Sequence, residues 1–312
     1  MKIGYLFPGQ GTQTVGMGKD LYEKYEAYRN IYQRANDLTG YHLEDITFHG
    51  PEEQLNQTKY TQIAVLTMSL ALLELLNKER IEPAACLGLS LGEYSALICG
   101  KALTFEDGIK IIKKRGILMQ ELCPKGDWHM VAIMGLDEEK VTKICKSITS
   151  GFIAPANFNC PGQIVVSGEK EAIEEAIQKA KEEGARKTVE LNTAGPFHTV
   201  MLEEAAKKLR EELENITIHK FETSVIKNID GKVYQNNDNI KDILAKHIMC
   251  PVRMEEGIRT MLDMGIDTFL EVGPGKTLSG FVKRINKEVN VLNINNVETL
   301  ENAIAFIKGG NA

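Results

Sequence analysis

A serine flanked by two glycines is the first group in this chain whose setting points to chemistry. Residues 86–94 contain the pattern G-x-S-x-G centred on Ser90. A short apolar run precedes it and a helix-like run follows, and this context is typical of a nucleophile elbow. Gly88 and Gly92 let strand and helix approach closely. The pattern predicts a nucleophilic Ser90 hydroxyl, and a Leu91 N–H at a helix N-terminus that helps to hold an oxyanion.

A serine hydroxyl needs a base within reach to become nucleophilic. The chain has six histidines. Surface position or packing explains four of them: His42, His49, His129 and His219. His198 follows Gly-Pro-Phe in a loop between two predicted domains, where ligands often bind. His247 lies near the end of a predicted helix, where it can complement the helix dipole. The residues alone favour His198 as the base, with His247 second.

A loop rich in glycine and glutamine, residues 8–13, follows the first predicted strand at 2–7. Open α/β sheets bind ligands at the carboxyl ends of their strands, so we expect a polar site here. The loop lacks the later glycine and lysine of a phosphate-binding loop, and phosphate binding is therefore not expected.

The elements that position these loops alternate between strands and helices, which predicts an α/β fold with a parallel sheet core. From about residue 127 the pattern changes to β-α-β-β-α-β, the order of a small ferredoxin-like domain. We therefore predict a large α/β-hydrolase-like catalytic domain at 1–126 and 195–312 and an inserted ferredoxin-like subdomain at 127–194.

Several single elements bear on the site. A helix at 58–78 is apolar nearly all round and should be buried. Helices are also expected at 17–37, 104–122 and 253–264, and a strand at 223–226. The helix at 104–122 carries three adjacent cations, of which we expect two to be solvated and the third to turn inward.

Composition narrows the function classes. The 312-residue chain carries a net charge of −6 and has no strongly basic segment, so nucleic-acid binding is not expected. No uninterrupted apolar run reaches the ~18 residues of a membrane helix. Six scattered cysteines lack metal-ligand spacing and indicate reduced thiols in a cytoplasmic protein without a metal site.

The motifs together resemble those of malonyl-CoA:acyl-carrier-protein transacylases, the loading enzymes of bacterial fatty acid synthesis. The likeness covers nearly the whole chain. It rests on segments in a fixed order: 7–13 (FPGQGTQ), 88–97 (GLSLGEYSAL), 114–116 (KRG), 157–163 (NFNCPGQ), 195–198 (GPFH) and 271–275 (EVGPG).

The resemblance assigns a role to each matching residue. Ser90 matches the acylated serine and His198 the catalytic histidine. Arg115 matches the arginine that binds the free carboxylate of malonate, a task suited to a two-pronged guanidinium. Gln10 matches the residue whose backbone N–H joins that of Leu91 in the oxyanion hole.

Two further residues complete the predicted substrate site, and the chain departs from the family twice. Phe197 would narrow the acyl pocket. Leu89 stands where the family often has histidine. His247, grouped here with the substrate-binding residues, stands where the family usually has glutamine, whose backbone carbonyl holds the catalytic imidazole.

The resemblance further implies malonyl-CoA and phosphopantetheinylated acyl carrier protein as substrates, no cofactor, and a monomer. Three alternatives stay open. A serine hydrolase or thioesterase shares the elbow, but expects the order Ser, Asp or Glu, then a late His. The malonyltransferase could serve a polyketide synthase. The non-enzymatic alternative is a subunit that docks the carrier protein and keeps only an inactive remnant of the site.

Overall fold

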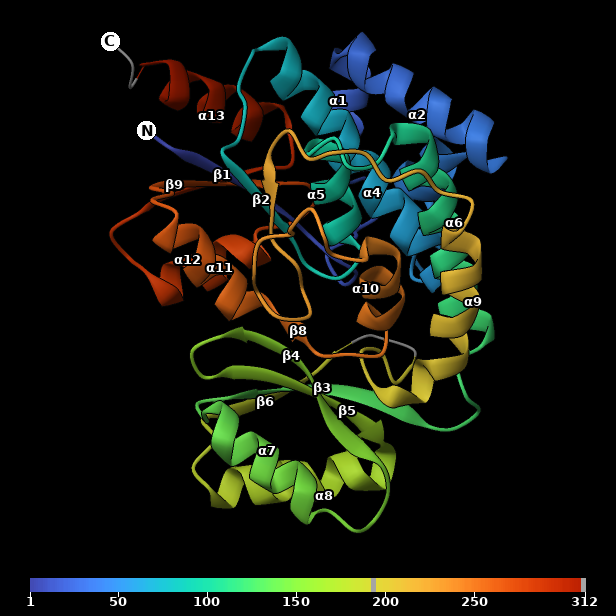
Figure 1. Ribbon diagram of the computed structural model, residues 1–312, viewed down its shortest axis with the longest axis vertical. Helices are drawn as coiled ribbons and strands as arrows, with labels where there is room; N and C mark the ends of the chain where they lie inside the picture. The colour runs from blue at the N-terminus through green and yellow to red at the C-terminus, as the bar shows by residue number, and fades with distance from the viewer. Residues whose placement is uncertain (192–194, 310–312) are drawn as a thin grey trace.

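The computed structural model describes residues 1–191 and 195–309. Figure 1 shows a larger part around one sheet and a smaller part with a second sheet, stacked along the long axis of the molecule. The predicted domain boundary at residue 194 and the last three residues of the chain lie outside the described residues.

The larger part is built on a five-stranded parallel sheet with the strand order β10-β9-β1-β2-β7. Its strands are β1 (Ile3–Phe7), β2 (Ala85–Gly88), β7 (Ser224–Val225), β9 (Thr268–Val272) and β10 (Asn290–Ile294). Tyr5 and Phe7 of β1 face one apolar cluster and Leu6 faces another, as expected for a strand buried on both faces. The predicted parallel core is confirmed.

Helices cover both faces of this sheet. The main cluster receives α2 (Glu26–Thr39), α4 (Thr58–Lys78), α5 (Gly92–Cys99), α6 (Phe105–Glu121), α9 (Glu203–Leu213), α10 (Ile240–His247) and α13 (Val297–Gly309). The opposite face receives α11 (Met254–Asp263) and α12 (Thr277–Ile285). Short helical segments complete this part: α1 (Lys19–Lys24), η1 (Asp45–His49), α3 (Glu52–Leu55) and η2 (Val200–Leu202).

Helix α4 is the central buried helix that its composition predicts. By length and apolar content alone it would suffice to cross a membrane, yet 83% of its most apolar window is buried inside the protein. It packs against α2 and α6, so its apolar surface belongs to the core.

The smaller part is a five-stranded sheet with the order β6-β3-β5-β4-β8. Its elements are β3 (Trp128–Met134), α7 (Glu138–Ser147), β4 (Ile153–Cys160), β5 (Gln163–Glu169), α8 (Lys170–Glu182), β6 (Lys187–Glu190) and β8 (Val252–Arg253). The first six follow the β-α-β-β-α-β order expected from the sequence. Val131 and Ile133 pack toward α7 and α8, whereas Met130 and Ala132 turn to the main core.

Several local expectations were wrong. The helix predicted at 17–37 is two helices, because Tyr25 between them is extended with φ −112° and ψ 117°. The helix predicted from Arg253 begins at Met254, because residues 252–253 pair with β4 as an added edge strand. His219 lies exposed in a loop and not in a strand.

Candidate active site

Ser90 occupies a tight turn between β2 and α5. Its φ of 55° is in the left-handed region, which is strained for a residue with a side chain. A Cβ on Gly88 would lie 1.9 Å from the Gly92 carbonyl carbon, and one on Gly92 would lie 2.2 Å from the Phe7 oxygen. Only glycines fit this approach of strand and helix, as the elbow pattern predicted.

Asn228 holds the strained turn from the side. The Ser90 N–H donates to Asn228 Oδ1 at 2.8 Å, and Asn228 Nδ2 donates to the Gly88 carbonyl at 2.6 Å. The Asn228 side chain is fully buried. Both ends of its amide are therefore used to fix the backbone on either side of the serine.

His198 is the histidine that the fold brings to the serine. Its Nε2 lies 2.9 Å from the Ser90 Oγ. Its Nδ1 lies 3.0 Å from the His247 carbonyl oxygen and 3.2 Å from that of Cys250. Since carbonyl oxygens only accept, Nδ1 carries the proton and Nε2 is left to accept the serine proton.

The setting of His198 keeps its ring neutral. The side chain is 4% exposed. Burial lowers the pKa of His198 well below its ordinary value, and the neighbouring His247 and Arg115 lower it further. The backbone carbonyls on Nδ1 act in the opposite direction but do not offset burial.

Arg115 is the cation of the three at 113–115 that turns inward. It is 1% exposed, whereas Lys114 is exposed and pairs with Glu212. Its Nη1 donates to Gln62 Oε1 at 2.7 Å and its Nη2 donates to Ser90 Oγ at 3.0 Å. Burial lowers the pKa of Arg115. Among residues 1–191 and 195–309, no carboxylate forms an ion pair with this guanidinium, which leaves it suited to an anionic ligand.

The loops after β1 and β2 meet beside the serine. The Leu89 N–H donates to the Phe7 carbonyl at 2.9 Å, and a Cβ on Gly9 would lie 2.5 Å from the Leu89 oxygen. The Gln10 side chain is directed to Thr58 at 3.4 Å. Within the described parts of the chain, the backbone N–H groups of Gln10 and Leu91 have no hydrogen-bond acceptor. They are the free donors that an oxyanion hole requires.

A cavity of about 440 Å³ adjoins Ser90 between the two sheets, and neither Arg115 nor Leu91 lines it directly. Gln10, Ser90, Phe197 and His198 line it, together with apolar residues of β3 and β5. Phe197 is 5% exposed and lines the cavity, and its narrowing of the acyl pocket stays a prediction. His247 does not line this cavity; it lies behind His198 and is fully buried.

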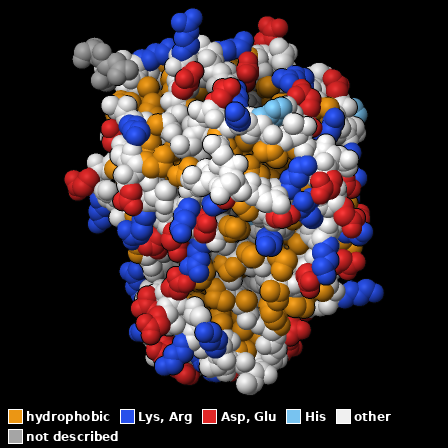
Figure 2. All heavy atoms as spheres, viewed as in Figure 1, with side chains coloured by type: hydrophobic (Ala, Val, Ile, Leu, Met, Phe, Trp, Pro, Cys, Tyr) orange, Lys and Arg blue, Asp and Glu red, His pale blue; other side chains and the backbone are white. Residues whose placement is uncertain are grey.

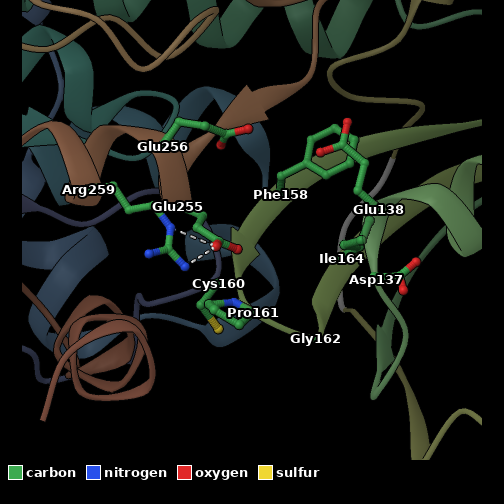
Figure 3. Close-up of a pocket in the computed structure, with 10 residues that line it drawn as sticks. All are labelled: Asp137, Glu138, Phe158, Cys160, Pro161, Gly162, Ile164, Glu255, Glu256 and Arg259. Carbon is green, nitrogen blue, oxygen red and sulfur yellow. Dashed lines mark hydrogen bonds and ion pairs between the residues drawn. The ribbon is translucent and has the colours of Figure 1, made fainter.

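A second hollow of about 330 Å³ lies between α11 and the β4–β5 hairpin (Figure 3). Two of its acids form ion pairs, Glu255 with Arg259 in the lining and Glu138 with Arg253 beside it. Burial raises the pKa of its one thiol, Cys160. None of the predicted catalytic residues lines it, and the cavity at Ser90 is the better candidate site.

Three side chains at the site were missed by the sequence analysis: Gln62 on Arg115, Asn228 on the elbow, and Glu93. Gln62 is a buried polar residue inside an apolar helix, and that contrast was a usable clue. Glu93 is likewise an acid in a buried run. Asn228 lies far along the chain in a loop and carries no comparable sequence feature.

A strained serine lies beside a buried histidine, a buried arginine and two backbone N–H groups without acceptors in the part of the chain that the structure describes. These groups stand on an α/β core with an inserted ferredoxin-like sheet. This combination of fold and site is that of an acyltransferase. The family model described as "Acyl transferase domain" matches residues 4–303. The chain belongs to this family, within the group of malonyl CoA-acyl carrier protein transacylases.

The similarity to named relatives extends over the full length. The Bacillus subtilis malonyl CoA-acyl carrier protein transacylase is 40% identical over 312 residues, covering 99% of this chain and 98% of the relative. The solved Clostridium perfringens transacylase has a TM-score of 0.95 at 42% identity, covering 100% and 98% of the two chains. A malonyl-transacylase solved in complex with a type II PKS acyl-carrier protein has a TM-score of 0.94 at 36% identity, covering 98% and 100%.

Proposed function

We propose that this protein transfers the malonyl group from malonyl-CoA to the phosphopantetheine thiol of acyl carrier protein, through a malonyl ester on Ser90. The observation that carries the proposal is the contact of one serine oxygen with both His198 and Arg115, at 2.9 Å and 3.0 Å. A base and a carboxylate-binding cation at the same nucleophile suit an acyl donor that is itself an acid. The relatives named above are transacylases of this kind.

The first half-reaction acylates the serine. His198 Nε2 takes the Ser90 proton as the oxygen attacks the thioester carbonyl. The N–H groups of Gln10 and Leu91 stabilise the resulting oxyanion. The tetrahedral intermediate then collapses, and the CoA thiolate leaves with the proton held by His198.

The second half-reaction reverses these roles. His198, neutral again, takes a proton from the carrier thiol as it attacks the malonyl ester, and then returns a proton to Ser90. The lowered pKa of His198 favours the release of its proton to the leaving group in each half-reaction. No redox or metal step is needed.

Arg115 would select the acyl donor. A malonyl carboxylate can accept two parallel bonds from the guanidinium, whereas an acetyl group offers it nothing. Binding a carboxylate also compensates a cation that is buried without an anionic partner. The selection thus comes from the arginine rather than from the shape of the cavity alone.

The carbonyl partners of His198 argue against a conventional serine hydrolase, whose histidine is oriented by a carboxylate. Here the histidine is oriented by the backbone oxygens of His247 and Cys250. The intact serine–histidine contact argues against a vestigial site. Fatty acid synthesis is the pathway that we propose, while a neighbour solved with a PKS acyl-carrier protein favours the polyketide alternative.

An acidic carrier protein would need a local cluster of cations to bind to a chain whose net charge is −6. Figure 2 shows cationic and anionic side chains intermixed over one face of the molecule. Arg284 donates to Gln163, which lines the cavity, and is therefore a cation close to the Ser90 cavity. We further propose a cytoplasmic monomer that works without a cofactor.

The test is a transfer assay with purified protein, malonyl-CoA and carrier protein, followed by intact-mass analysis of the carrier. The expected result is a malonyl adduct on the holo carrier and none on the apo carrier, which lacks the thiol. Free malonate accumulating at the same rate with either carrier would instead favour a hydrolase.

A further inference from the structure

Behind His198 lies a second buried pair that the proposed mechanism does not use. Glu93 and His247 are both fully buried, and His247 Nδ1 lies 2.8 Å from Glu93 Oε2. The two atoms are within ion-pair distance, although their alignment is not that of a hydrogen bond. His247 Nε2 has no hydrogen-bond partner among the described residues. The two histidine rings lie 5.1 Å apart between centroids.

This pair closes a circuit of contacts around the nucleophile. Glu93 Oε1 accepts from the Asn228 N–H at 3.1 Å, and Asn228 Oδ1 accepts from the Ser90 N–H at 2.8 Å. In the other direction, the His247 carbonyl accepts from His198 Nδ1 at 3.0 Å, and His198 meets Ser90 at 2.9 Å. The turn that carries Ser90 and the loop that carries His198 are therefore connected by two routes. One is the Ser90–His198 contact, and the other runs through Glu93 and His247.

The surroundings of Glu93 offer one basic group in direct contact. A buried carboxylate needs a counter-charge as well as hydrogen bonds. Tyr234 donates its hydroxyl to Glu93 at 2.8 Å, but it is neutral, since burial raises the pKa of Tyr234. Tyr94 is neutral for the same reason. The basic groups facing this region are His247 from α10, His198 from its loop and Arg115 from α6, and only His247 touches Glu93.

We propose that Glu93 and His247 form a buried ion pair that acts as a positioning unit for His198. The pair holds the 247 carbonyl against the imidazole and presents a fixed positive charge to the back of the ring. This inference rests on the proposed function, because it concerns how that reaction's base is set. It assigns His247 a role behind the base in place of the substrate-binding role expected from the sequence.

Two consequences distinguish this role from simple packing. Loss of the positive charge would make His198 easier to protonate, so acylation would fail at a higher pH than in the unaltered protein. The binding of malonyl-CoA would be unaffected, because neither residue lines the cavity. The change should therefore be in the pH profile and in kcat, with KM unchanged.

The experiment measures the acylation half-reaction with malonyl-CoA between pH 5 and 8.5 for the unaltered protein, His247→Gln, Glu93→Gln and the double variant. His129→Gln is the matched control, because His129 also contacts two carboxylates, Asp127 and Glu190, but on the smaller sheet. Thermal unfolding of each variant is recorded alongside. Should His247→Gln fail to fold, Glu93→Gln and Glu93→Asp carry the test.

We expect both single variants to move the acid limb of kcat/KM upward by about one pH unit, with about a tenfold loss at pH values below the limb of the unaltered protein and full recovery at pH values above the limb of the variant. The double variant should match the single ones, since either change removes the charged pair. Unshifted profiles, or losses equal at all pH values, would overturn the proposal. Failure of the unaltered protein to acylate at all would instead overturn the proposed function.

Discussion

Replacing Arg115 by alanine should change which acyl donor the protein accepts. The guanidinium is 1% exposed and has no anionic partner among the described residues. A malonyl carboxylate would accept two charge-assisted bonds in this buried setting, each worth about 1.5–3 kcal/mol. Because one of those N–H groups leaves the Ser90 oxygen to bind the substrate, we take the lower end, a net of about 3 kcal/mol, or ~10²-fold.

The acetyl donor isolates the part of the effect that does not involve the carboxylate. Arg115→Ala removes the bond from Nη2 to Ser90 Oγ for every donor. Such a bond contributes about 1 kcal/mol, so acetyl transfer should fall only ~5-fold. The ratio of the two losses, and not either loss alone, reports carboxylate recognition.

The assay is the single-turnover acylation rate with malonyl-CoA and with acetyl-CoA, compared as kcat/KM ratios. Arg115→Lys is the companion variant, because it keeps the charge but loses the fork, and it should fall between the alanine variant and the unaltered protein. Equal losses for the two donors in Arg115→Ala would refute the selection mechanism.

Three further predictions concern the support of the site. The lowered pKa of His198 places the acid limb of acylation below pH ~6.5. Its folded-state pKa lies below its unfolded pKa of ~6.5, so His198 contributes stability at pH values above ~6.5, and this stability should be lost as the pH falls from ~6.5 through the folded-state pKa. Chemical denaturation at stepped pH measures that loss. Gly92→Ala puts a Cβ 2.2 Å from a backbone oxygen and should destabilise by ~3 kcal/mol or more, whereas Gly280→Ala, with nothing within 4 Å, should stabilise by up to ~1 kcal/mol in the same denaturant titration. Asn228→Ala strands the Ser90 N–H and should lower acylation ~10-fold with KM nearly unchanged; a purely raised KM would contradict the role given to Asn228.

Local sequence patterns were sufficient for much of the fold. The apolar runs at 2–7 and 84–87 predicted strands of the parallel core, found at 3–7 and 85–88, and the all-round apolar helix at 58–78 predicted a core helix. The split of the helix at Tyr25 and the short strand β8 were missed. Both depend on tertiary pairing or on a single extended residue, which periodicity does not report.

The residues of the candidate site likewise separate into those that a local sequence pattern predicts and those that depend on tertiary packing. Ser90 was found from its glycine-flanked turn, because that turn is a local steric feature. His198 was only favoured by its loop, since its meeting with the serine is set by the packing of α10 and the loop at 195–199. The contacts of Asn228 and of the Glu93–His247 pair were not predicted, because each joins residues more than a hundred positions apart.

The central claim is that Ser90 becomes covalently malonylated with His198 as its base. The most direct measurement is peptide mass spectrometry after brief exposure of the protein to malonyl-CoA, with Ser90→Ala and His198→Ala treated in parallel. We predict a malonyl adduct on the peptide that contains Ser90, absent in Ser90→Ala and strongly reduced in His198→Ala. An unlabelled Ser90 peptide, or a malonyl group found on another residue, would contradict the account.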